Sequence, residues 1–207
     1  MKEHSGNTNH EPAGSSNGGQ FTFGDGSSFV KALQKGAGLP SERDKSLGEI
    51  EKRLAGKSTE AGVIVDEDGN IVQEIQGDAD KVALSSETLK AMENNTFTHN
   101  HPNEGSLSPE DLRNFVYSNA AEFRAVSMNG KDVFVITRPE DGWGSPSKRV
   151  SLMLRVRDAS NKFLQQQANK GIEDVLKGKP LFDALEKMNI EMAKKFGWIY
   201  RIERGNK

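Results

Sequence analysis

The sequence predicts an α/β domain, a mixed β-sheet with helices packed on it, preceded by a flexible N-terminal tail. Short β-branched runs such as 61–65 and 71–75 alternate with longer segments whose apolar residues recur every three or four positions. Turn residues such as Asn129-Gly130 separate these runs. The first residues, up to about 28, are dominated by Gly, Ser and Asn. They bury too little apolar area to offset the entropy of ordering.

Composition excludes several classes of function. The chain of 207 residues has a net charge of −2 and no Cys. There is thus no overall basic field for nucleic acid, and thiolate metal sites, thiol nucleophiles and disulfides are excluded. No apolar run approaches the roughly 18 residues of a membrane span, and the N-terminus has no apolar signal core. We therefore expect a cytoplasmic protein in which any metal is held by His and carboxylates.

Two regions are expected: a flexible tail over 1–38 and one folded domain over 39–207. The end of the tail, 29–38, carries the pattern of a short helix that stops at Gly36 or Gly38. His4 and His10 lie in the tail. Because their surroundings are so polar, we interpret them as solvated side chains and not as a metal site.

The first elements of the domain follow from local patterns. A helix is predicted from Pro40-Ser41 to Gly56, because Leu47, Ile50 and Leu54 recur at helical spacing. Asp66 to Asn70 is a turn sequence between two β-branched runs, which predicts a hairpin. The next predicted elements are strands over 61–65 and 71–75, a short strand at Val82–Leu84, and a helix that begins at Ser85 or Ser86 and runs through Met92.

A strand is predicted over 96–101, where Pro102 ends it. Side chains alternate between the faces of a strand, so Phe97, His99 and His101 point to the same side. The two histidines would therefore lie next to apolar core.

The second half reads as helix, hairpin, two helices and a strand. A helix beginning at Pro109 is predicted from an apolar stripe of Leu112, Phe115, Val116, Ala120 and Phe123. The remaining predicted elements are a hairpin over 124–128 and 132–137, a loop over 139–146, helices over 147–170 and 180–196, and a final strand over 198–202.

The stretch from Thr98 to Asp111 holds the candidate site. The only histidines of the predicted domain, His99 and His101, lie there two residues apart. Ser108 and Asp111 have an alternative explanation, since a serine N-cap with an acid three residues later is a standard helix start. A helix start aimed at the end of a histidine-bearing strand also brings a carboxylate to those histidines. His99, His101 and Asp111 are three ligands of the kind that a catalytic zinc takes, with a fourth position for water.

These residues resemble the signature of the JAMM (MPN domain) metalloproteases, which have an upstream Glu, then His-x-His-Pro, then Ser-x-x-Asp. The tetrad His-Asn-His-Pro is similar to the RadC-like branch, and the likeness covers about 58–137 and extends towards 202. The motif set as a whole looks closest to that of phage and mobile-element members of the family. The tail segment His10–Phe21 also resembles a linker of such proteins. The resemblance implies a mixed sheet like that of JAMM and cytidine-deaminase proteins.

The resemblance also implies roles for individual residues. His99, His101 and Asp111 would bind zinc, Glu60 would be the general acid/base, and Ser108 would donate a hydrogen bond to the developing oxyanion. The alternatives for the carboxylate acid/base are Glu67, Glu74 and Glu104, and Glu60 could also be a solvated residue that opens a strand. The chain departs from the family in one respect: residues 102–110, nine in all, separate His101 from Asp111, where the usual pattern has ten.

Three functions follow as hypotheses. The first is a zinc-dependent hydrolase of peptide or isopeptide bonds, with a protein or peptide substrate and possible phage structural proteins as partners. The second is a JAMM-like docking module without catalysis. The third is a RadC-like role with nucleic acid, which the net acidity disfavours although Lys148, Arg149, Arg155 and Arg157 are basic. No membrane partner and no ubiquitin-binding insertion are indicated.

Overall fold

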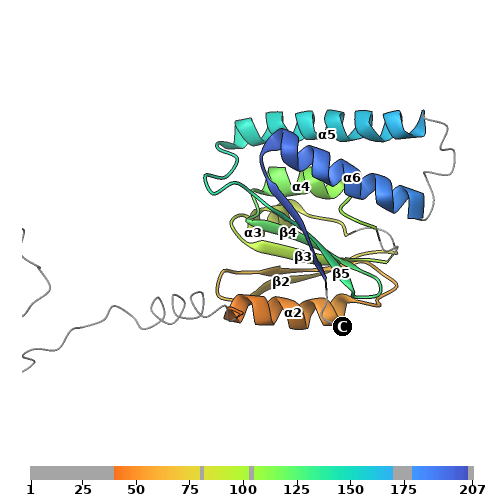
Figure 1. Ribbon diagram of the computed structural model, residues 1–207. Helices are drawn as coiled ribbons and strands as arrows, with labels where there is room; N and C mark the ends of the chain where they lie inside the picture. The colour runs from red at the N-terminus through yellow and green to blue at the C-terminus, as the bar shows by residue number, and fades with distance from the viewer. Residues whose placement is uncertain (1–39, 80–81, 103–104, 170–178, 205–207) are drawn as a thin grey trace, which may run out of the picture. The chain divides into compact units, whose positions relative to one another are not determined.

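The computed structural model describes residues 40–79, 82–102, 105–169 and 179–204. It has a six-stranded sheet in the order β2-β1-β3-β4-β5-β6 (Figure 1). Only β3 and β4 run parallel, and every other neighbouring pair is antiparallel. The predicted mixed α/β fold is therefore confirmed. The strands are β1 (Ala61–Val65), β2 (Ile71–Gln76), β3 (Thr96–His101), β4 (Glu122–Ser127), β5 (Asp132–Thr137) and β6 (Ile199–Arg204).

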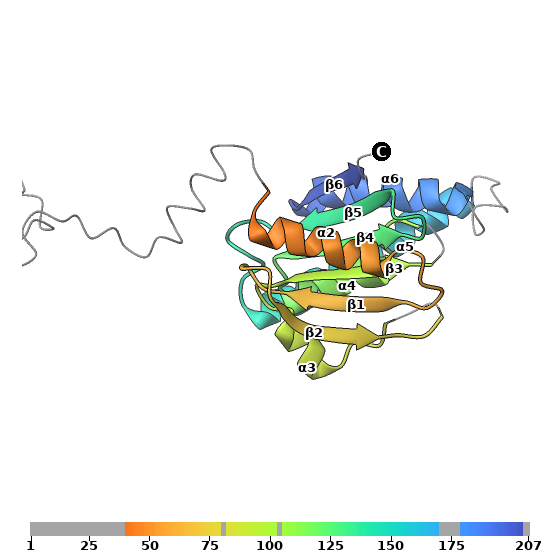
Figure 2. The same ribbon diagram turned by 90° about the horizontal axis from the view of Figure 1, so that it is seen from below.

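Helices cover both faces of the sheet within the unit that begins at Glu42. They are α2 (Glu42–Leu54), α3 (Ser86–Ala91), α4 (Pro109–Ser118), α5 (Pro146–Ala168) and α6 (Lys179–Phe196). Figures 1 and 2 show α2 on one face and α4, α5 and α6 on the other. Helix α3 packs against β2 and α4. The sheet is the middle of three layers, so its central strands are buried on both faces.

The larger core lies between the sheet and α4, α5 and α6. Phe97, Phe115 and Phe123 are at its centre, each 2% exposed or less. Trp143 and Trp198 pack edge-to-face against Phe115, with ring centroids 5.7 and 6.1 Å away. A smaller core under α2 is formed by Leu47, Ile50, Leu54, Ala61, Val63 and Val65. The spacing of three and four between the helical residues of this smaller core explains why α2 forms where the sequence predicts it.

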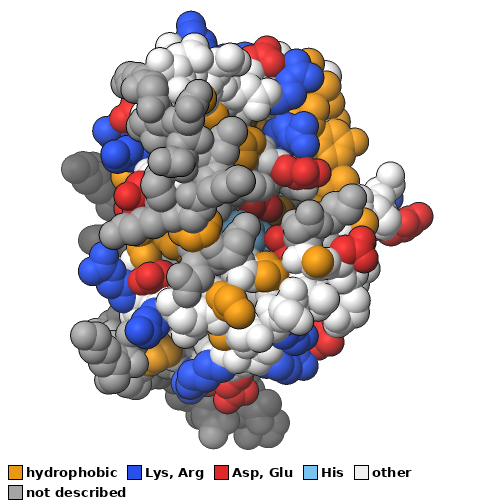
Figure 3. Space-filling model, turned by 90° about the vertical axis from the view of Figure 1, so that its right-hand side faces the viewer, with side chains coloured by type: hydrophobic (Ala, Val, Ile, Leu, Met, Phe, Trp, Pro, Cys, Tyr) orange, Lys and Arg blue, Asp and Glu red, His pale blue; other side chains and the backbone are white. Residues whose placement is uncertain are grey.

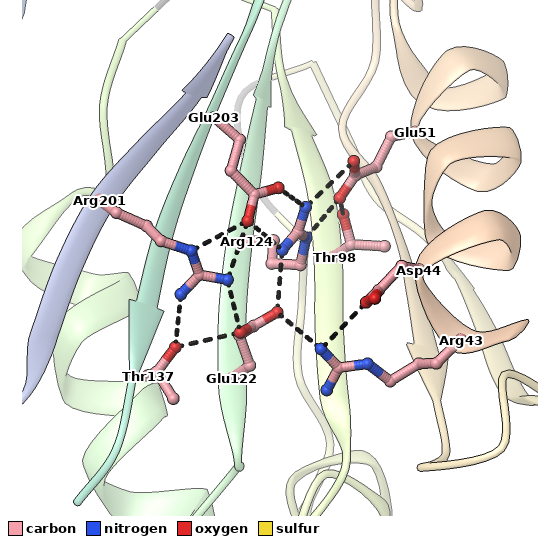
Figure 4. A network of polar contacts seen from close by, with 9 residues as sticks. All are labelled: Arg43, Asp44, Glu51, Thr98, Glu122, Arg124, Thr137, Arg201 and Glu203. Carbon is pink, nitrogen blue, oxygen red and sulfur yellow. Dashed lines mark hydrogen bonds and ion pairs between the residues drawn. The ribbon is translucent and has the colours of Figure 1, made fainter. Parts of the chain in front are cut away.

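The α2 face of the sheet also holds a buried charge network centred on Arg124 (Figure 4). Its guanidinium donates to Glu51 at 2.5 Å, to Glu122 at 2.9 Å, and to Glu203. Arg201 bonds Glu122 from β6 at 2.9 Å. These groups join α2, β4 and β6, three elements that are far apart in the sequence. Beyond the small core, the network shares this face with a second apolar cluster of Val126, Val133 and Val135.

Two sequence predictions are wrong in detail. The helix from Pro109 ends at Ser118, because Asn119 adopts the left-handed conformation (φ 57°) and forms the C-cap. Ala120 and Phe123 therefore do not continue its apolar stripe, and β4 begins at Glu122 where the prediction had Arg124. Val82–Leu84 forms no strand. Its residues pack against the main core from an irregular segment instead.

Some predictions concern residues outside the described ranges. The tail over 1–38, its boundary with the domain, the helix over 29–38 and Glu104 all lie there. Over the part of the chain that is described, no helix is long and apolar enough to cross a membrane.

Candidate metal centre

Strand β3 places the two histidines on one face of the sheet. It lies between β1 and β4, and all six of its residues are buried. Phe97 and His99 stack on that face with ring centroids 5.1 Å apart, as the alternation of side chains predicts. Gly62 faces His99 across the β1–β3 ladder. A Cβ at Gly62 would lie 2.5 Å from the Phe97 ring, so only glycine leaves room for this stack.

The start of α4 supplies the third group. Ser108 accepts a hydrogen bond from the Asp111 backbone N–H at 3.2 Å, and the Asp111 carboxylate accepts one from the Ser108 N–H at 2.7 Å. This is the predicted capping box, with Pro109 in the first turn. The same carboxylate faces the histidines: its two oxygens lie 3.4 Å from His99 Nε2 and 3.4 Å from His101 Nε2. Asp111 thus caps the helix and completes the histidine cluster.

The donor atoms fit a metal ion. One ligand atom from each of His99, His101 and Asp111 lies within 4.8 Å of the other two. Ligands about 2.1 Å from a tetrahedral zinc are about 3.4 Å apart from one another. Each His–Asp separation, at 3.4 Å, matches that edge, although the two distances are measured to different oxygens of the Asp111 carboxylate. The separation of the two Nε2 atoms, 2.9 Å, is shorter.

Hydrogen bonding selects the tautomer of His101. Its Nδ1 lies 2.8 Å from the Gly105 carbonyl, which can only accept, so Nδ1 carries the proton. The lone pair of neutral His101 is then on Nε2 and points at the cluster. A carbonyl that holds the other nitrogen is the usual support of a metal-binding histidine. His99 lacks this support, because its buried Nδ1 has no hydrogen-bond partner among the described residues.

The charges of the cluster stabilise one another. Burial raises the pKa of the Asp111 carboxyl, but the two histidines outweigh it and hold that pKa well below its ordinary value. Burial likewise lowers the pKa of His101, and Asp111 outweighs it, so the net shift is upward. An ionised carboxylate beside two imidazoles is the charge state that a divalent cation needs.

Glu60 reaches the same site from the start of β1. Its backbone continues the hairpin pairing, because its N–H donates to Asp78 O and its C=O accepts from Gly77 N–H, each at 2.8 Å. Burial raises the pKa of the Glu60 carboxyl, an effect that His99 and His101 oppose. The backbone of Glu60 is therefore held by hydrogen bonds, and its carboxylate interacts electrostatically with the two histidines.

A cavity of about 140 Å³ joins these groups. Figure 3 shows the face where it opens, with histidine atoms in a hollow between carboxylates and apolar side chains. The cavity is lined by Glu60, Val82, Leu84, Phe97, His99, His101, Ser106, Ser108, Glu110, Asp111, Asn114 and Leu185. All five residues singled out from the sequence, namely the three candidate ligands, Glu60 and Ser108, line it together.

The alternatives to Glu60 do not reach this cavity where they are described. Glu67 is exposed in the turn between β1 and β2. Glu74 lies on β2 and pairs with Arg53 at 2.6 Å. The third alternative, Glu104, lies outside the described residues.

Asn100 supports the site, but nothing in the nearby sequence indicated its role. Asn100 lies between the two histidines in sequence but points to the opposite face of the sheet. Its side chain accepts from Ala61 N–H at 2.8 Å and donates to the carbonyls of Thr59 at 3.1 Å and Lys57 at 3.3 Å. It thereby fixes the backbone on both sides of Glu60. Strand alternation could have assigned the face of Asn100, but not these partners, which are about 40 positions away.

Comparisons with known proteins add no relatives. No family model matches the chain. No curated protein and no solved structure matches it either.

Proposed function

We propose that the protein is a zinc-dependent hydrolase of peptide or isopeptide bonds, of the JAMM metalloprotease type. The observation that carries the proposal is the convergence of His99, His101, Asp111 and Glu60 on one cavity. Two imidazoles and one carboxylate form the ligand set of a catalytic zinc site that keeps a position open. A second carboxylate beside that position is what acid/base catalysis requires.

Zinc is the metal that best suits these donors. The chain has no Cys, so softer ligands are absent, and nitrogen donors disfavour Ca²⁺ and Mg²⁺. When bound, zinc lowers the pKa of a coordinated water to about 7 and polarises the carbonyl of the substrate.

The protein side chains supply the proton transfers and the anion binding. Glu60 accepts a proton from the attacking water and delivers it to the leaving amine, and burial raises its pKa, which favours the second of these transfers. Ser108 accepts the cap bond from Asp111 N–H through an oxygen lone pair. Its hydroxyl proton remains available for the oxyanion of the tetrahedral intermediate.

Metal analysis of the purified protein is the direct test of the site. We expect about one zinc per chain in the wild type, from one set of three ligands. The double variant His99→Ala/His101→Ala should lose it and stay folded. The matched control is His4→Ala/His10→Ala, which removes the only other histidines of the chain and should keep the zinc. A wild-type protein with no affinity for zinc would refute the proposal.

A second experiment separates catalysis from docking. Purified protein is incubated with a quenched-fluorescence peptide library and with peptides joined through a lysine isopeptide bond. Glu60→Gln should keep its zinc and lose cleavage, whereas Glu67→Gln, a matched change at an exposed glutamate, should keep both. Zinc binding without cleavage in the wild type would favour a docking module. Salt-sensitive DNA binding without cleavage would favour the RadC-like role.

A further inference from the structure

The loop from Gly105 to Ser108 controls two parts of the metal centre. Gly105 O holds His101 Nδ1 at 2.8 Å, and Ser108 caps α4 and faces the cavity. Between them, Ser106 and Leu107 are buried, at 2% and 0% exposed. The conformation of this loop therefore sets both the orientation of the His101 ring and the place of the Ser108 hydroxyl.

Two residues from the end of the chain hold the loop. Asn189 of α6 donates through Nδ2 to Ser106 Oγ at 3.1 Å and to Leu107 O at 2.9 Å. Tyr200 of β6 shares a hydrogen bond with the same Ser106 Oγ, at 3.1 Å. The contacts span more than 80 positions of sequence, since Asn189 and Ser106 are 83 residues apart.

Asn189 is an unfavourable residue for packing alone. It is 0% exposed on the otherwise apolar buried face of α6, and its Oδ1 has no hydrogen-bond partner among the described residues. Burying an unpaired carbonyl oxygen is destabilising, and a leucine would fill a similar volume without that penalty. The favourable contacts that remain are the donors, which point at the loop and at Leu185 O of the same helix at 2.9 Å.

We propose that Asn189, assisted by Tyr200, is a positioning residue that holds the loop 105–108 and thereby fixes the tautomer and orientation of His101. The inference rests on the proposed function, because it assigns a role at the proposed metal centre. It also makes α6 and β6 part of the site, although Asn189 does not line the cavity.

The test compares four variants. Asn189→Leu removes the donors at similar volume, Asn189→Asp replaces them with acceptors, and Tyr200→Phe removes one hydroxyl. The control is Val156→Ala, which thins the same core from α5, at a residue that is 0% exposed and does not line the cavity. Melting temperatures show how far each change destabilises the fold.

The first readout needs no metal. Nitrogen NMR of the metal-free protein at alkaline pH, about 9, reports the tautomer of each neutral histidine. We expect His101 to carry its proton on Nδ1 in the wild type and in Val156→Ala. Asn189→Leu and Asn189→Asp should populate the other tautomer.

The second readout is zinc affinity by competition with a chelator. We expect it to fall about 10- to 100-fold in Asn189→Leu. In Tyr200→Phe, which loses one neutral hydrogen bond, we expect a fall of about two- to tenfold. Val156→Ala should bind zinc as the wild type does.

The outcomes decide between the two proposals. Unchanged tautomer and affinity in Asn189→Leu, with a melting temperature lowered as in Val156→Ala, would overturn the positioning role. If Asn189→Leu does not fold, an unchanged tautomer in both Asn189→Asp and Tyr200→Phe overturns it equally. A wild type that binds no zinc defeats the proposed function, while the tautomer measurement still decides whether Asn189 holds His101.

Discussion

Replacing Arg124 with methionine should destabilise the protein strongly at neutral pH. Glu122 would keep Arg201 at 2.9 Å and the Thr137 hydroxyl at 3.0 Å. Among the residues that the structure describes, Glu51 would keep only the Thr98 hydroxyl at 3.3 Å. The side chain of Glu51 is 10% exposed, so its charge would be stranded away from water. Removing one partner of a buried ion pair in this way costs about 3–5 kcal/mol, against a total of about 5–15 kcal/mol for a domain.

Urea denaturation followed by the fluorescence of Trp143 and Trp198 measures this loss. With a slope of about 2 kcal/mol per molar urea, the midpoint should fall by about 2 M. Burial already raises the pKa of Glu51, and losing Arg124 would raise it further. The variant deficit should therefore shrink as the pH falls from 7 to 5 and Glu51 takes up a proton.

The double variant Arg124→Met/Glu51→Met is the control, because it removes the stranded charge with the arginine. It should recover at least half of the lost stability. A loss below about 1 kcal/mol in the single variant, or a deficit that stays the same from pH 7 to pH 5, would refute this account.

Three further predictions concern the site and the sheet. Gly62→Ala should destabilise the fold by about 1–3 kcal/mol and weaken zinc binding, because the new methyl displaces the Phe97 ring that stacks on His99. Thermal melting measures the first effect and chelator competition the second. An unchanged zinc affinity would contradict the proposed dependence of zinc binding on this stack. Ser108→Ala should cost about 0.5–2 kcal/mol from the lost cap and reduce cleavage about 100- to 1,000-fold while zinc stays bound, as metal content and turnover would show. Burial raises the pKa of Glu122, but the neighbouring arginines outweigh this effect, so the pKa lies below its ordinary 4.5. The ionised Glu122 therefore stabilises the fold above pH 4.5, and this stabilisation is lost as the pH falls through the folded pKa. In urea titrations the stability difference between wild type and Glu122→Gln should narrow below pH 4.5, and a difference that widens there would contradict the prediction.

Local sequence rules predicted the parts of the site that depend on neighbours in the chain. Strand alternation placed His99 and His101 on one face beside Phe97, and capping chemistry placed Asp111 at the start of a helix. These rules work over two to four residues, where backbone geometry alone decides which side chains meet. The contact between Asp111 and the histidines required one further step, the direction in which α4 leaves β3.

The errors arose where the same residues suit two structures. Ala120 and Phe123 fit a helical stripe, and both are buried in the main core, but from the segment after α4 and from β4. The helix ends earlier because Asn119 tolerates a left-handed conformation, and Ala120 then pairs with Glu93 in an isolated bridge. The spacing of apolar residues indicates that they are buried, but it does not indicate whether they belong to a helix or to a strand.

The supporting residues of the site could not be predicted for a different reason. Asn189 and Tyr200 meet Ser106 only after α6 and β6 have packed on the sheet, and nothing near them in the sequence marks a partner. Val82 was predicted to lie in a strand, whereas its segment forms the cavity wall and its backbone N–H donates to the Glu60 carboxylate. Such long-range partners are decided by tertiary structure.

The capping box also determines how an ion would be captured. In small zinc modules the ligands are brought together by the ion, so that loading and folding are one event. Here two ligands stand on a buried central strand, and the third is already immobilised by the Ser108 N–H at 2.7 Å. The cage is preorganised, so little conformational entropy is lost when the ion enters. Metal binding would then be a reversible exchange with a folded protein, and chelators should remove the ion without unfolding the chain.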